Sequence, residues 1–163
     1  YLAVRVFDDT IAFGGSSFEG DSVEICTAKS DERKISFSRE SDWRRFIVAP
    51  VSGSDSKGAG ATSGTTRLRK FGQRSMWGGE ARTEDLSDGR AAFVRDAHQY
   101  TIEIALSRSE LGWGDVGDAL NELDIAINDR DSGGSRKSQL AWSGTERNAY
   151  SSRYYGRVHL PRP

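Results

Sequence analysis

The stretch Ile125–Trp142 reads I-A-I-N-D-R-D-S-G-G-S-R-K-S-Q-L-A-W and joins two strand patterns through a polar turn. Apolar side chains alternate at its start, which is typical of a strand with one face in a core. Asn128, Asp129 and Asp131 follow where that strand pattern stops, and a Gly-Gly turn leads to a second short strand. We expect the turn to present oxygen ligands, and the terminal Trp142 to lie in the core.

The same period-two alternation recurs along the chain about every ten residues. It predicts strands at residues 1–7, 22–27, 43–48, 99–106, 123–128, 138–142 and 155–160, with weaker candidates at 67–71, 77–83 and 91–95. Small residues dominate 52–64 and predict a loop. Ser107 starts a single helical turn. Regular strands with almost no helical periodicity favour an all-β fold, an antiparallel β-sandwich.

Size and charge narrow the functional classes. The 163 residues correspond to one domain, 1–163, and the net charge is −1. So balanced a charge gives no global field for nucleic acid or an anionic membrane surface. No apolar run approaches the roughly 20 residues of a membrane span. We therefore expect neither a nucleic-acid partner nor membrane insertion.

The single cysteine, Cys26, lies within a strand pattern and is expected to be a small buried side chain. With one cysteine the chain has no intrachain disulfide. The sequence opens inside a strand pattern and without an initiator Met, so we expect a fragment of a longer protein whose first strands are missing.

Three segments carry a family pattern. They are Phe18–Ile25 (F-E-G-D-S-V-E-I), Ile127–Trp142 (I-N-D through Arg136 to L-A-W) and Tyr155–Leu160 (Y-G-R-V-H-L). Taken in this order they resemble family 9 carbohydrate-binding modules, a group of jelly-roll, DOMON-like β-sandwiches. The resemblance implies sugar binding rather than catalysis.

In that family the end of a glycan lies between two aromatic rings, and polar groups bond its hydroxyls. A sugar ring has an apolar face that stacks on an aromatic ring, while its hydroxyls need hydrogen-bond partners. Carried onto this chain, the rings are Phe18 and Tyr150, where the family has Trp. The polar groups are Glu24 and Arg136. Glu24 is expected on the outward face of its strand, opposite Val23 and Ile25, where it would be exposed. A further amide-bearing position of the family is Ala126 here.

Acidic residues could also hold calcium, which takes six to eight oxygen ligands. Asn128, Asp129 and Asp131 are the first candidates, with Asp129 capping backbone amides of the turn as the alternative. A second acidic group consists of Asp8, Asp9 and Asp21. We expect calcium in a structural role.

Catalysis has no support in the spacing of the residues, because no nucleophile motif, Cys–His pair or zinc-type His cluster is present. Two other functions stay open. One is a haem-binding, DOMON-type electron-transfer domain using Met76 with His98 or His159. The other is a structural β-sandwich that packs on a partner.

The function that the sequence favours is calcium-assisted binding of an oligo- or polysaccharide. We expect the domain to be an accessory module beside other domains of a larger bacterial parent chain. Such a protein would be extracytoplasmic, secreted or periplasmic, and act in carbohydrate catabolism.

Overall fold

The computed structural model describes residues 1–12, 20–29, 44–50, 62–71, 83–86, 89–113, 121–131, 138–145, 152 and 154–158. The described residues form strands, with bounds β1 (Leu2–Phe7), β2 (Ser22–Lys29), β3 (Arg44–Pro50), β4 (Thr62–Phe71), β5 (Thr83–Asp85), β6 (Arg90–Arg95), β7 (Gln99–Ala105), β8 (Asn121–Asp129), β9 (Ser138–Ala141) and β10 (Gly156–Val158). None of them belongs to a helix long and apolar enough to cross a membrane.

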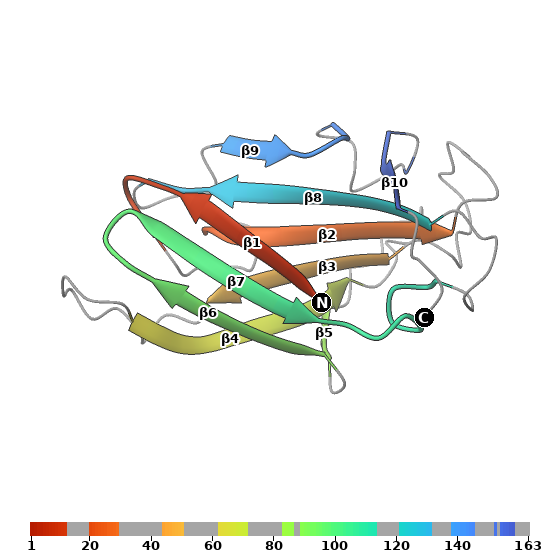
Figure 1. Cartoon of the computed structure of the whole chain (residues 1–163), viewed down its shortest axis with the longest axis horizontal. Coiled ribbons are helices and arrows are strands. Elements are labelled where there is room, and N and C mark those ends of the chain that lie inside the picture. The colour runs from red at the N-terminus through yellow and green to blue at the C-terminus, as the bar shows by residue number, and fades with distance from the viewer. Residues whose placement is uncertain are drawn as a thin grey trace.

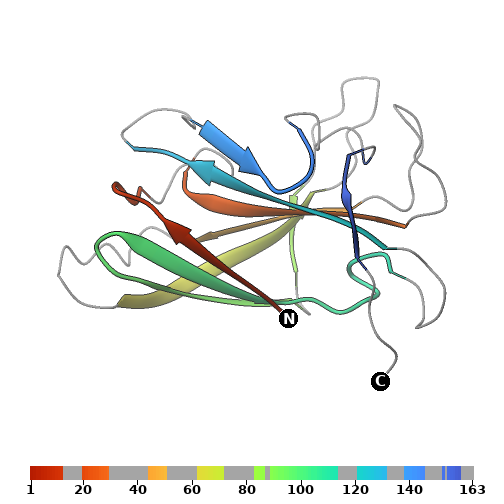
Figure 2. The same ribbon diagram turned by 45° about the horizontal axis from the view of Figure 1, so that its top comes forward.

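The strands make two layers that face each other (Figures 1 and 2). They follow one hydrogen-bonded path, β1-β7-β6-β4-β3-β2-β8-β10, and every pair is antiparallel. The long β4 belongs to both layers, because its first part pairs with β6 and its second part pairs with β3. β9 pairs with β8, and β5 with β4. This arrangement confirms the predicted all-β, antiparallel β-sandwich.

The core lies between the two layers and is formed by alternate positions of the strands. Its buried members are Val23, Ile25, Phe46, Val48, Leu68, Phe93, Tyr100, Ile102 and Ile104. Half-buried apolar side chains of β1 and β8 pack around them. The alternation that predicted these strands therefore reports the face that each strand turns to the core.

The predicted strands agree in position with strands of the structure, but several of their ends differ. β2 continues to Lys29, β3 continues to Pro50 and β8 begins at Asn121. The loop predicted at 52–64 ends earlier, because Thr62–Gly64 belong to β4 and pair with β6. Backbone hydrogen bonds of a ladder do not require apolar side chains, so this part of the strand has no hydrophobic pattern. The weak candidate at 77–83 lies outside the described residues except at Thr83, where β5 starts.

Trp142 is not in the core, contrary to the prediction. It is 60% exposed, and Leu140 on the same strand is 72% exposed. β9 pairs only with β8, so it lies at an edge of the described sheet, where an alternating pattern does not bring burial. The indole lies over Gly156, where an added Cβ would come within 2.6 Å of the ring.

The predicted helical turn after β7 is present as a capped turn at residues 107–113. Ser107 Oγ accepts a hydrogen bond from the Glu110 amide at 3.1 Å, and Gly112 supplies a positive φ of 72°. Thr27 Oγ1 on β2 donates to the Leu111 carbonyl at 2.7 Å. This bond ties the turn to the layer that carries the buried polar residues.

The buried ring of Phe46 contributes to the stability of the sandwich. Phe46 is 0% exposed, so Phe46→Ala removes a fully buried ring and leaves a cavity, and we expect it to lower the free energy of unfolding by about 3–5 kcal/mol. Phe7→Ala is the matched control, because Phe7 is 77% exposed. Denaturant unfolding followed by tryptophan fluorescence measures both, and equal losses would contradict the assignment of the core.

Candidate functional site

A buried polar network lies on the face of the β2–β3–β8–β9 layer that points away from the core. At its centre is Glu24, which is 3% exposed. Asn128 Nδ2 donates to Glu24 Oε1 at 2.9 Å, and Gln139 Nε2 donates to the same oxygen at 3.3 Å. Asn128 also donates to Ser22 Oγ at 2.9 Å. The network therefore links β2, β8 and β9.

Arg45 on β3 supplies the opposite charge. Its Nε and Nη2 lie 2.9 and 2.7 Å from Glu24 Oε2, so two guanidinium nitrogens bind one carboxylate oxygen. Charge-assisted bonds of this kind compensate the loss of hydration of a buried carboxylate. The side chain of Arg45 is 17% exposed and Gln139 is half-buried. Arg45 and Gln139 are thus the members of the network that reach the surface.

Sequence reasoning found Glu24 but placed it on an exposed face. The structure puts its side chain on the predicted side of β2, opposite Val23 and Ile25, but buries it. Arg45 was not predicted, because its contact with Glu24 depends on the pairing of β2 with β3, which the sequence pattern does not report. Phe18, Arg136 and Tyr150 lie outside the described residues.

Ala126 occupies the position where the family pattern has an amide. It is 3% exposed and pairs with Glu24 on one side and Ala141 on the other. Gln139 pairs with Asn128, the residue two positions further along β8, and its Nε2 donates to Asn128 Oδ1 at 2.9 Å. An amide is therefore present on this face, but it comes from the neighbouring strand.

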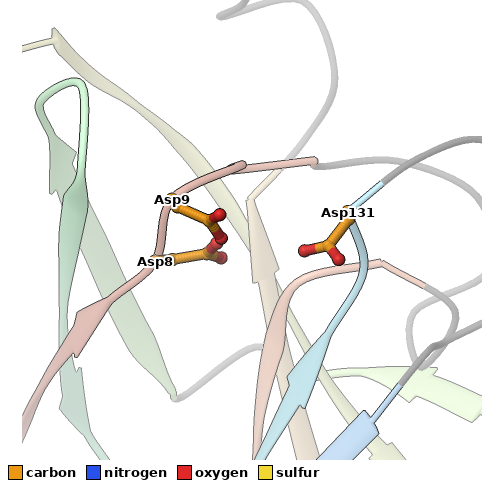
Figure 3. A group of neighbouring side chains, drawn as sticks. All are labelled: Asp8, Asp9 and Asp131. Carbon is orange, nitrogen blue, oxygen red and sulfur yellow. The ribbon is translucent and has the colours of Figure 1, made fainter.

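A second polar feature is an acidic cluster at the end of the sandwich where β1 and β8 stop and β2 starts. Single carboxylate oxygens of Asp8, Asp9 and Asp131 lie within 4.8 Å of one another, and so do those of Asp8, Asp21 and Asp129. Figure 3 shows the Asp8 and Asp9 carboxylates turned toward Asp131 from the end of β1. The two acidic groups that the sequence kept apart therefore form one cluster, with Asp8 in both halves.

Asp21 anchors this cluster. One of its oxygens accepts a hydrogen bond from the Ala12 amide, and the other accepts one from the Arg130 amide at 2.8 Å. Burial, together with the charges of Asp8 and Asp129, raises the pKa of Asp21 to about 7 despite these two bonds. Burial also raises the pKa of Asp8. Burial is the largest cause of both shifts, and neighbouring carboxylates add to it.

The structure separates the three residues first considered as metal ligands. Asn128 is 0% exposed and its amide is used within the Glu24 network. Asp129 and Asp131 lie in the acidic cluster, where Asp129 Oδ2 accepts a hydrogen bond from Ser138 Oγ at 2.7 Å. Asp21 accepts hydrogen bonds from backbone amides of the segments after β1 and after β8. The turn at 132–137, whose amides Asp129 was expected to cap, lies outside the described residues.

Other candidates have ordinary places in the fold. Cys26 is buried, as predicted, and burial raises the pKa of its thiol to about 12, so it is no reactive thiolate. Tyr155 is 5% exposed and packs on Cys26 and Ala28. His98 is exposed in the turn before β7, and Met76 and His159 lie outside the described residues.

Comparison with known proteins gives three findings. Residues 1–162 match the family described as carbohydrate family 9 binding domain-like. Two solved structures of a family 9 carbohydrate binding module from Caldicellulosiruptor kristjanssonii share the fold. The glucose complex has a TM-score of 0.64 and 17% identity over 98% of this chain and 69% of that chain. The cellotriose complex has a TM-score of 0.63 and 17% identity, over 97% and 67% respectively. No curated protein sequence gives a significant match.

The raised pKa of Asp21 predicts an unusual pH dependence in chelator-treated protein. Between its ordinary value of 3.8 and about 7, the folded protein holds a proton that the unfolded chain has released. Stability from this group is therefore gained as the pH falls through about 7 and lost as the pH rises through it. We expect the melting temperature to rise from about pH 8 to about pH 5, and this rise to shrink in Asp21→Asn. Identical pH profiles for the two proteins would contradict the prediction.

Proposed function

This chain belongs to the carbohydrate family 9 binding domain-like family, and from this premise we propose that it binds carbohydrate without catalysing a reaction. Two solved structures of this fold have glucose and cellotriose bound, respectively. We propose gluco-oligosaccharides as the first ligands to test. The domain would act as an accessory module of a larger extracytoplasmic protein that degrades or captures polysaccharide.

The observation that carries this proposal is the Glu24 network. A carboxylate and a guanidinium in contact cancel each other's charge, so the surface-reaching groups Arg45 and Gln139 suit a neutral ligand with many hydroxyls. All four lone-pair positions of Glu24 have donors: two from Arg45, one from Asn128 and one from Gln139. Glu24 then acts mainly by holding Arg45 and Gln139 in place.

Phe18 and Tyr150 complete the proposed site as the two rings that enclose the sugar, with Arg136 as a further hydroxyl-binding group. Phe18 lies six residues before Glu24 in the sequence. Rings supply apolar contact area while the charged groups supply orientation, which is how aromatic pockets recognise sugars.

We expect Phe18→Ala and Tyr150→Ala each to weaken cellotriose binding about tenfold or more, because each removes a stacking surface. Phe7→Ala and Tyr1→Ala are matched controls, since Phe7 and Tyr1 are exposed side chains of β1 and its start. Isothermal titration calorimetry measures the affinities. Unchanged affinity in both site variants would refute the assignment of Phe18 and Tyr150 as the two rings. Failure of the unmutated protein to bind any glucan would refute the proposed binding of carbohydrate.

We also propose that the acidic cluster binds a structural calcium ion. Its donors are carboxylates from the end of β1 and the end of β8, which is the oxygen set that calcium prefers. The raised pKa values of Asp8 and Asp21 support this, because a bound cation would stabilise the ionised form that burial and neighbouring carboxylates disfavour. The ion would join the loops after β1 and β8 at one end of the sandwich.

Added calcium is expected to raise the melting temperature by roughly 5–10 °C at about 100 times its Kd. Asp8→Asn should remove most of this rise, because Asp8 belongs to both halves of the cluster. Glu103→Gln, an equal change of charge at an exposed position of β7, should leave it intact. Differential scanning fluorimetry with calcium, magnesium or chelator measures these shifts, and the same rise in all three proteins would count against this ion site.

A further inference from the structure

Gln139 makes a contact that crosses a whole strand. β8 lies between β2 and β9, and neighbouring strands are about 4.8 Å apart, so β2 and β9 are about 10 Å apart. Gln139 Nε2 on β9 nevertheless lies 3.3 Å from Glu24 Oε1 on β2. Its side chain therefore reaches over β8.

The residue that allows this reach is Ala126. It is the β8 residue paired with Glu24, and its side chain is a single methyl group. Ala141, paired with Ala126 on the other side, is equally small. A long side chain at position 126 would compete with Gln139 for the space beside Glu24.

The network also sets which way the Gln139 amide points. An ionised carboxylate only accepts hydrogen bonds, so the NH2 group must face Glu24. Asn128 uses its own NH2 on Ser22 and Glu24, so its oxygen accepts from Gln139. Both bonds of the Gln139 amide are made by Nε2, and no described residue donates to its Oε1.

We infer that Gln139 determines specificity at the proposed sugar site, with Oε1 accepting a hydrogen bond from one sugar hydroxyl. The inference rests on the proposed function. Gln139 is half-buried, so the amide is both held by the network and accessible to a ligand. An acceptor locked by two donor bonds is pre-organised, which favours a hydroxyl donor over a group that only accepts.

The test compares Gln139→Ala and Gln139→Leu with the unmutated protein. Isothermal titration calorimetry measures the affinity of each protein for glucose, its monodeoxy analogues and cellotriose. Both variants should lose about tenfold in affinity for cellotriose, the loss expected for one hydrogen bond to a partly buried group. Gln139→Leu keeps the side-chain volume, so a loss shared by both variants is not caused by a cavity. Gln99→Ala is the control, since Gln99 Nε2 also binds a carboxylate, that of Asp96 at 2.6 Å, but on the other layer.

A purely structural role is separated from recognition by the deoxy sugars. The unmutated protein should bind one of the monodeoxyglucoses more weakly than glucose. This difference in affinity should be absent in Gln139→Ala. In the double variant Ala126→Gln with Gln139→Ala, an amide returns to the same face from β8, and affinity should recover toward that of the parent.

The outcomes distinguish this inference from the premise. One outcome is that the unmutated protein binds glucan and that both Gln139 variants keep its affinity and its discrimination among deoxy sugars. The role of Gln139 is then refuted, while carbohydrate binding stands. If the variants lose affinity equally for every deoxy sugar, Gln139 only supports the fold of the site. If the unmutated protein binds none of these sugars, the proposed function and this inference both fail.

Discussion

In an antiparallel ladder, a shift of one residue moves every side chain to the other face of the sheet, and the β2–β8 ladder is where such a shift would do the most damage. Its register pairs Ser22 with Asn128 and Ile25 with Ile125. One face of β2 thereby supplies core residues, while the other supplies Glu24 to the polar network. Core, network and acidic cluster all depend on this single register.

Polar groups reinforce the register that the apolar residues favour. The Ser22–Asn128 bond lies within a paired row of the ladder, and Asp21, just before β2, binds the amide just after β8. A slipped ladder would leave these buried groups without partners, which costs about 1–3 kcal/mol for each group. The buried charge of Glu24 is tolerated for the same reason, since Arg45 and two amides surround it.

The two polar features of the sandwich have different chemistry. The Glu24 network pairs its charges and reaches the surface through Arg45 and Gln139, which suits recognition of a neutral, hydroxyl-rich ligand. The acidic cluster brings several carboxylates close together, and burial raises the pKa of Asp21, which suits a cation. Asn128 belongs to the first and its neighbour Asp129 to the second, so one strand end serves both.

The sequence by itself determined the fold class, most strand positions and the family, because alternating burial and ordered motifs are properties of the linear chain. It also placed Glu24 on the correct side of its strand. Only the tertiary structure decided that Glu24 is buried and paired with Arg45, that Trp142 is exposed, and that the acidic residues of β1 and β8 form one cluster. Spacing within one strand cannot report these facts, because they depend on which strands lie side by side. Position 126 shows the same limit. The family pattern has an amide there and this chain has Ala126, while the amide on that face comes from Gln139 on the neighbouring strand. Only the pairing of β8 with β9 reveals that Gln139 lies there.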